Sequence, residues 1–252
     1  RFVESLGGRY YTAEDVGTSV EDMDYVKMET EYVTGVAGGS GDPSPVTAYG
    51  TYRGIKACAK EKYGSDSVSG MTVAVQGTGH VGYYLCQFLS KEGAKLIVTD
   101  IDEARVQRVV KEFGAQAVGP DQIYSVDAQI FAPCALGAVI NDDTLERLGV
   151  DIVAGAANNQ LATAEHGDRL HEKGILYAPD YAINAGGLIN VYGEINRWTP
   201  ERAKRKAGEI YNTLLRIFDR AEKEGVPPSE AADRVAMSRI NEARKLGRTF
   251  KP

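Results

Sequence analysis

The sequence has 252 residues, with 29 Lys and Arg against 35 Asp and Glu, so its formal net charge is −6 at pH 7. Hydrophobic residues make up 43% and charged residues 25%, which is typical of a globular chain and excludes an intrinsically disordered one. The acidic balance argues against nucleic-acid binding. No apolar run approaches the roughly 18 residues that span a bilayer, so no membrane segment is expected. Three cysteines without CxxC spacing and no visible signal peptide indicate a reducing, cytoplasmic location and no disulfide framework. His166 and His171 lie five residues apart without an H-E-x-x-H motif, so no metal site is expected.

The first 46 residues carry weak and mixed signals. The chain opens with Arg1, and Phe2, Val3 and Leu6 lie at helical spacing with no N-cap before them, as expected of a truncated sequence that begins inside a helix. Residues 9–12 read as a strand, residues 13–17 as a turn, and residues 21–34 are ambiguous. The glycine-rich residues 35–43 form the strongest linker signal in the chain.

The centre of the sequence alternates between helices and short apolar strands. Ser44 and Pro45 predict an N-cap and a first helical position, with the helix ending near residue 63. Strands are expected at residues 71–76, 96–100, 129–132, 152–154 and 175–177, with helices at 81–92, 103–113, 142–148 and 164–173. Apolar strands alternating with helices are typical of a parallel sheet covered on both faces, so we predict a doubly wound, Rossmann-type α/β fold. Residues 200–224 and 228–246 are expected to form two further helices.

A dinucleotide-binding fingerprint follows the first of these strands. Gly77, Gly79 and Gly82 match G-x-G-x-x-G between a strand and a helix, and Asp100 ends the next strand. In this pattern the helix N-terminus binds a pyrophosphate, and the acid binds the adenosine ribose and disfavours the 2′-phosphate of NADP. The sequence therefore predicts NAD as cofactor, with Asp102 able to share the ribose role. The alternative is a tight glycine turn without a ligand.

Several stretches together resemble the glutamate/leucine/phenylalanine/valine dehydrogenase family, closest to its leucine dehydrogenase branch. They occur in family order at residues 12–18, 45–50, 75–82, 131–135, 153–160 and 177–187. The resemblance implies NAD-dependent oxidative deamination of an L-amino acid to its 2-oxo acid and ammonia, by a homo-oligomer. It also implies that Asp15 is the catalytic carboxylate that moves a proton at the substrate amine. Without the flanking motif, Asp15 would be read as a residue that caps a turn.

The resemblance assigns cofactor contacts along the chain. Thr47 is expected near the nicotinamide amide, and Arg105 on the adenosine side, although a solvated Arg is an alternative for the latter. The other expected cofactor-binding residues are Thr78, His80, Val81, Ile101, Ala132, Pro133, Cys134, Ala157, Asn158, Asn159 and Asn184. For Cys134 we expect a packing role rather than a nucleophile. Each Asn has the alternative role of a turn former.

Four residues are implied in substrate binding: Ala13, Asn158, Leu188 and Val191. Aliphatic side chains around the substrate favour a branched aliphatic amino acid, because they would leave the γ-carboxylate of glutamate buried and unpaired. Leucine, valine and isoleucine are not separated by this argument, and phenylalanine stays an alternative because a methylene changes binding by only about 1–3 kcal/mol.

The sequence departs from the family at one point. Members carry a catalytic lysine in a Gly-Gly-Gly-Lys-type motif upstream of the aspartate, and this sequence has no such motif. Two functions therefore stay open: a dehydrogenase, or an NAD-binding module without turnover of its own. A hydroxy-acid dehydrogenase would need a catalytic His with Arg and Asp partners, and no such set is visible. We expect a partial substrate domain with a hinge (residues 1–46), an NAD-binding domain (47–182), and a hinge with C-terminal helices (183–252).

Overall fold

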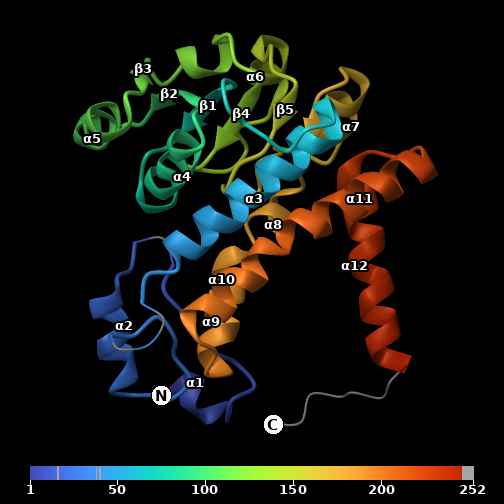
Figure 1. Cartoon of the computed structure of the whole chain (residues 1–252). Coiled ribbons are helices and arrows are strands. Elements are labelled where there is room, and N and C mark those ends of the chain that lie inside the picture. The colour runs from blue at the N-terminus through green and yellow to red at the C-terminus, as the bar shows by residue number, and fades with distance from the viewer. Residues whose placement is uncertain (16, 38, 40, 246–252) are drawn as a thin grey trace.

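A six-stranded parallel sheet forms the centre of the computed structural model, which describes residues 1–15, 17–37, 39 and 41–245 (Figure 1). The strand order is β3-β2-β1-β4-β5-β6. The strands are β1 (Thr72–Gln76), β2 (Lys95–Thr99), β3 (Gln116–Ala117), β4 (Ile130–Pro133), β5 (Ile152–Val153) and β6 (Leu176–Tyr177). The order reverses beside β1, and in such doubly wound sheets ligands bind beyond the carboxyl ends of the strands at that point. The predicted fold class is confirmed.

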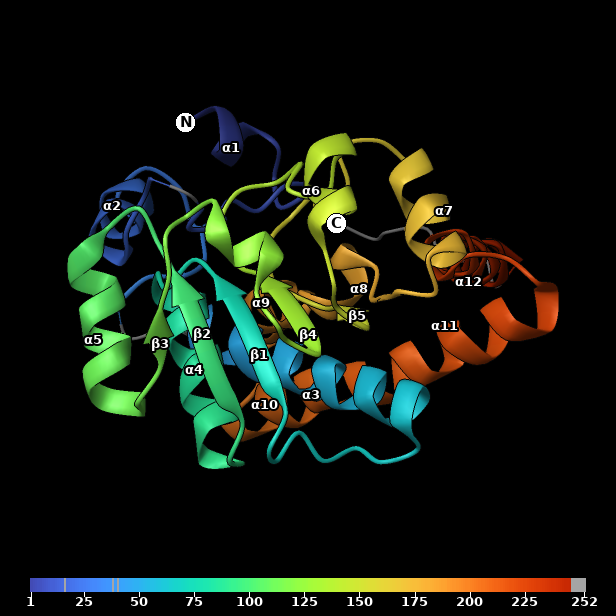
Figure 2. The same ribbon diagram turned by 90° about the horizontal axis from the view of Figure 1, so that it is seen from above.

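Successive strand residues point to opposite faces of the sheet, and an apolar cluster covers each face. In β1, Val73 and Val75 enter one apolar cluster and Ala74 enters the other. The first cluster is covered by α3 (Ser44–Tyr63), α4 (His80–Lys91) and α5 (Glu103–Phe113). The second is covered by η1 (Gln122–Ser125), α6 (Asp142–Arg147) and α7 (Glu165–Glu172), which lie on the other side of the strands in Figure 2.

The helix α3 also joins the sheet to the C-terminal helices. It packs against α9 (Gly186–Ile195), α10 (Pro200–Gly208) and α11 (Ile210–Glu224) as well as against α4, and lies between the two groups in Figure 1. Gly54 makes this contact close, since a Cβ there would overlap Ile183, at the end of α8 (Asp180–Ile183), and Leu214 of α11. The last helix, α12 (Pro228–Lys245), packs against α7 and α11 and then extends away from the body.

The N-terminal segment contains α1 (Phe2–Ser5) and α2 (Val20–Lys27). Residues 9–12, expected as a strand, supply only one isolated bridge, between Thr12 and Val33. The Thr12 N–H donates to the Tyr32 carbonyl at 3.0 Å and the Thr34 N–H donates to the Thr12 carbonyl at 2.9 Å. This bridge ties the two arms of the segment together around α2.

Some expected boundaries were wrong. Ser44 is the first residue of α3 rather than its N-cap, because the Pro43 carbonyl already accepts the Thr47 N–H at 3.0 Å, which makes Pro43 the N-cap. The helix expected over residues 200–224 is divided at Glu209 into α10 and α11. The predicted end of the last helix, near residue 246, lies outside the described residues, as do Val16 in the predicted turn and residues 38 and 40 in the predicted linker. The short elements β3, η1 and α8 had no periodic signal, since each has no more than four residues.

Candidate active site

The glycine loop between β1 and α4 has a shape that only glycine permits at two positions. Gly77 has φ +97° and lies so close to the loop that follows β4 that a Cβ would be 2.9 Å from Ala135. A Cβ on Gly82 would overlap the Gly77 carbonyl oxygen. At Gly79, by contrast, a Cβ would meet only the Arg105 guanidinium, at 3.6 Å. The loop is thus tightly packed behind and open in front, which fits the close approach of a pyrophosphate to the N-terminus of α4.

Asp100 lies beside this loop, as expected, and also holds it in place. One carboxylate oxygen accepts the Thr78 N–H at 2.6 Å, and the other accepts the Asp102 N–H at 3.0 Å. A carboxylate has about four acceptor positions, so capacity for ribose hydroxyls is left. The next residue, Ile101, is 96% exposed. A ribose role for Asp100 stays a prediction, and its loop-holding role was not foreseen.

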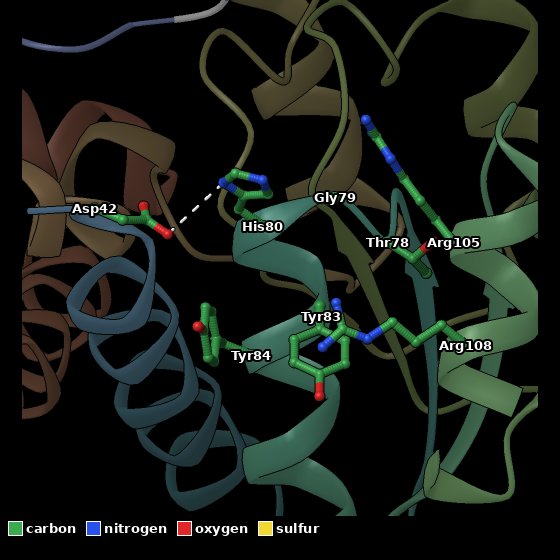
Figure 3. Close-up of a pocket in the computed structure, with 8 residues that line it drawn as sticks. All are labelled: Asp42, Thr78, Gly79, His80, Tyr83, Tyr84, Arg105 and Arg108. Carbon is green, nitrogen blue, oxygen red and sulfur yellow. Dashed lines mark ion pairs between the residues drawn. The ribbon is translucent and has the colours of Figure 1, made fainter. Parts of the chain in front are cut away.

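A cavity of about 340 Å³ opens between α4 and α5 (Figure 3). It is lined by Asp42, Thr78, Gly79, His80, Tyr83, Tyr84, Arg105 and Arg108. The Arg108 guanidinium lies over the Tyr83 ring, 3.8 Å from its centroid, while Arg105 extends past the glycine loop and pairs with Asp102 at 3.1 Å. Arg105 keeps an exposed side chain, so it could reach the adenosine side of a dinucleotide.

A second cavity, of about 550 Å³, has Asp15 on its wall. Its lining residues are Glu14, Asp15, Gly17, Thr18, Pro43, Ser44, Gly79, His80, Val81, Arg105 and Cys134. The predicted catalytic carboxylate therefore shares one cavity with the glycine loop and with the loop that follows β4. This juxtaposition joins residues more than sixty positions apart in the sequence.

The Asp15 backbone forms a tight turn. Its N–H donates to the Thr18 hydroxyl at 2.9 Å, and the Thr18 hydroxyl and N–H both donate to the Asp15 carbonyl, at 2.8 and 3.0 Å. These three bonds all use the Asp15 backbone. Asp15 can therefore take part in a turn and still be the predicted catalytic residue.

Glu14 is a second carboxyl in this cavity that the sequence reasoning did not single out. Its Oε2 is buried and has no hydrogen-bond partner among the described residues. Burial, and secondly the negative charge of Asp42, raise the pKa of Glu14 above its ordinary value. Asp42 in turn lies 3.7 Å from the His80 imidazole (Figure 3). The adjacent acids Glu14 and Asp15 were the only sequence signal for this pair.

The loops beyond β4 and β5 are bonded to each other and to β1. The Cys134 N–H donates to the Gln76 carbonyl at 2.7 Å, and the Ala157 N–H donates to the Pro133 carbonyl at 2.9 Å. Ala132 is fully buried. Burial raises the pKa of the Cys134 thiol to about 12, although the residue keeps some exposed surface, so the thiol is protonated at neutral pH. This supports packing rather than nucleophilic chemistry at Cys134.

The predicted asparagines meet at the same edge of the sheet. The Asn184 side chain donates to the Asn158 side-chain oxygen at 2.6 Å, and Asn159 has a left-handed backbone, φ +50°. Sequence reasoning missed Gln160, which is fully buried and whose amide donates to the Gly155 and Ala157 carbonyls. Its only sequence signal was a position beside the two asparagines.

Thr47 and two of the predicted substrate-binding residues, Leu188 and Val191, lie on or beside α9. A Cβ on Gly187 would be 2.9 Å from the Thr47 hydroxyl, which donates to the Pro43 carbonyl. Leu188 is 73% exposed and Val191 is half-buried on α9. Several predicted site residues do not line either of the two cavities described above: Ala13, Thr47, Asn158, Asn159, Asn184, Leu188 and Val191.

The described residues hold no group of three or more His, Cys, Asp or Glu side chains placed to bind a metal ion. Within residues 1–15, 17–37, 39 and 41–245, no helix combines the length and the apolar character needed to cross a membrane.

Comparison with known proteins agrees with this geometry. A family model for Glutamate/Leucine/Phenylalanine/Valine dehydrogenase matches residues 38–103 and 98–247. Leucine dehydrogenase from Thermoactinomyces intermedius is 59% identical over 253 residues, covering 99% of this chain and 69% of that protein. Leucine dehydrogenase from Bacillus subtilis is 56% identical, with 99% and 70% covered.

Among solved structures, L-tryptophan dehydrogenase from Nostoc punctiforme superposes with a TM-score of 0.86 at 45% identity, covering 97% of this chain and 71% of that one. The resemblance and the enzyme class expected from the sequence are confirmed: the chain belongs to the glutamate/leucine/phenylalanine/valine dehydrogenase family, and is an amino acid dehydrogenase by membership.

Proposed function

We propose that this chain carries out NAD-dependent oxidative deamination of a branched-chain aliphatic L-amino acid to its 2-oxo acid and ammonia. The observation that carries the proposal is the cavity whose lining Asp15 shares with Gly79, His80 and Cys134. It combines a carboxylate able to accept and return a proton with a loop suited to a dinucleotide. The names of its leucine dehydrogenase relatives support the substrate class.

Each part of the site has a separate task in this proposal. The open front of Gly79 and the N-terminus of α4 hold the pyrophosphate of NAD, and Arg105 lies on the adenosine side. NAD supplies the hydride acceptor when bound. Asp15 holds and moves the proton at the substrate amine. The loops at Cys134 and Asn158 border the nicotinamide end, with Thr47 and Asn184 beside them.

The preference for NAD rests on Asp100. A carboxylate beside the adenosine ribose accepts hydrogen bonds from its hydroxyls and repels a 2′-phosphate. Asp100 is anchored on both oxygens by backbone N–H groups, which fixes the position of that negative charge. NADP is therefore expected to bind more weakly than NAD.

The substrate side chain is proposed to lie against Leu188, Val191 and Ala13. The large exposed fraction of Leu188 agrees with a side chain that is covered when a ligand binds. We also propose a cytoplasmic homo-oligomer, and the division into residues 1–46, 47–182 and 183–252 given above.

Asp15→Asn tests the proposal. NADH absorbance is followed with L-leucine, L-phenylalanine and L-glutamate in turn, and NAD affinity is measured by titration. Asp15→Asn should lower turnover of L-leucine by about 10²-fold or more, as loss of a general acid–base group does, with NAD affinity unchanged. Asp66→Asn is the control, since this exposed residue precedes β1 at the opposite end of the sheet.

Full activity in Asp15→Asn would remove Asp15 from catalysis, and faster turnover of L-phenylalanine would overturn the aliphatic substrate. NAD binding by a chain that turns over none of the three amino acids would identify it as an NAD-binding module.

A further inference from the structure

We propose that Glu194, on α9, is a positioning residue for Asp15. Its carboxylate fastens the segment that carries Asp15 to α9, which packs against α3. This inference rests on the proposed catalytic role of Asp15. The link joins parts of the chain 159 residues apart and is not predictable from local sequence.

The Glu194 carboxylate lies directly against the glycine-rich loop after Val33. Its Oε2 accepts the Gly35 N–H at 2.9 Å, in partly buried surroundings. A Cβ placed on Gly39 would overlap the same carboxylate, so this part of the loop also lies directly against the end of the Glu194 side chain. One half-buried acid thus touches the loop at both of these glycines.

Gly35 transmits this contact to Asp15 through Glu14. Gly35 has φ +79°, and a Cβ there would lie 3.6 Å from the Glu14 Cβ and 3.8 Å from the Glu14 nitrogen, so the two backbones pack closely. The preceding residue, Thr34, is bonded to Thr12 on the other arm. Residues on either side of Ala13 are therefore set by the position of the Thr34–Gly35 backbone, and Asp15 follows directly.

The backbone of Glu194 is held in place because it is part of α9. Gly186, at the start of that helix, packs so closely on α3 that a Cβ would lie 2.8 Å from the Thr47 Cα. The helix α9 also packs against α10. Glu194 therefore connects the Asp15 segment to α9, whose first turn packs against Thr47 of α3.

A second carboxylate, Asp24, holds the same loop but cannot supply this connection. Its Oδ1 accepts the Ala37 N–H at 2.9 Å, yet Asp24 lies on α2, within the N-terminal segment itself. Loss of Asp24 would loosen the loop internally, whereas loss of Glu194 would free the whole segment from α9. Because a displacement of about 1 Å at a reacting group can lower rates by about 10²-fold, the second loss should reach catalysis.

The experiment compares Glu194→Ala, Glu194→Gln and Asn196→Ala with the unaltered chain. Gln keeps an oxygen that can accept the Gly35 N–H. Asn196 is an exposed residue at the same helix end, and its side-chain amide donates to the Tyr192 carbonyl within the helix. Amide hydrogen exchange is measured over residues 9–15 and 32–37. The kcat and KM for L-leucine, the Kd for NAD, and the melting temperature are measured alongside.

Glu194→Ala should raise exchange in both peptides at least tenfold and lower kcat by about 10 to 10²-fold, with the NAD Kd unchanged. In Glu194→Gln, exchange and kcat should both stay close to those of the unaltered chain, and Asn196→Ala should change neither quantity. Unchanged exchange in Glu194→Ala, or unchanged kcat in that variant while Asp15→Asn is inactive, would overturn the inference. If the unaltered chain and Asp15→Asn have equal turnover or none, the proposed function fails, and the exchange data alone decide whether Glu194 holds the segment.

Discussion

Gly79 is the N-cap of α4 and Gly82 lies in its first turn, and a side chain would meet different surroundings at each. A Cβ on Gly82 would overlap the Gly77 carbonyl within the protein, so this glycine is required by folding. A Cβ on Gly79 would project into the open cavity and approach only the flexible end of Arg105. Gly79 is therefore dispensable for the fold, and its small size matters only if another molecule comes close to the loop.

Gly79→Ala is expected to leave the melting temperature close to that of the unaltered chain and to weaken NAD binding at least tenfold, because the added methyl occupies the pyrophosphate position. Isothermal titration with NAD and thermal melting measure the two effects separately. Gly149→Ala is the matched control, since a Cβ there meets nothing within 4 Å and its φ is not in the left-handed region. Equal NAD affinity in both variants would place the pyrophosphate away from this loop.

At the scale of elements, α3 and the end of α4 are joined by a partly buried polar cluster. Lys56 forms an ion pair with Glu92, and the Tyr52 hydroxyl donates to the same carboxylate. Burial opposes ionisation of Glu92, but the hydrogen bonds from Lys56 and Tyr52 outweigh it and lower the pKa of this carboxyl. Both partners of the pair keep less than a fifth of their side-chain surface exposed, so solvent screens them weakly.

Glu92→Gln should therefore destabilise the fold in a pH-dependent way. A lowered folded-state pKa contributes stability above the unfolded value, and that contribution is lost as pH falls through the folded value. We expect the free energy of unfolding in urea to fall by about 3 kcal/mol at pH 7, because Lys56 stays buried and loses its counter-charge. The difference between variant and unaltered chain should shrink as the pH falls below about 4.

Glu31→Gln, in an exposed pair with Lys27, is the control and should leave the unfolding midpoint unchanged at both pH values. A Glu92→Gln difference that is the same at pH 7 and at acidic pH would contradict the ionic explanation.

The elements also show what local sequence can and cannot predict. Apolar runs predicted β1, β2 and β4, and the glycine spacing predicted the loop before α4, because those signals lie within a few consecutive residues. The cap of α3 was misplaced by one residue because the helical bonds already begin at the Pro43 carbonyl, which accepts the Val46 and Thr47 N–H groups. The site contacts of Glu194 with Gly35 depend on tertiary packing between distant segments, which no local pattern encodes.

At the scale of the whole molecule, α3 makes the sheet and the C-terminal helices parts of one core. Ile55, in the middle of α3, is fully buried, and its cluster contains Val75 of β1 together with Leu214 of α11. The single tryptophan, Trp198, lies on the far side of this junction, between α9 and α10, with the Arg202 guanidinium 4.4 Å from its ring centroid. Its fluorescence reports on the C-terminal helices rather than on the glycine loop.

NAD bound at the glycine loop should therefore raise the free energy of unfolding that is measured by Trp198 fluorescence. At a concentration one hundred times its Kd, a ligand that binds only the folded state stabilises it by about 2.7 kcal/mol. If the core unfolds as one unit, the stability measured by Trp198 fluorescence and that measured by far-UV circular dichroism will rise together by that amount. In Gly79→Ala, whose affinity for NAD is at least tenfold weaker, the same NAD concentration will add about 1.4 kcal/mol or less. A Trp198 transition that stays in place while the circular dichroism transition moves would mean that α9 and α10 unfold independently of the sheet, and that α3 does not couple them.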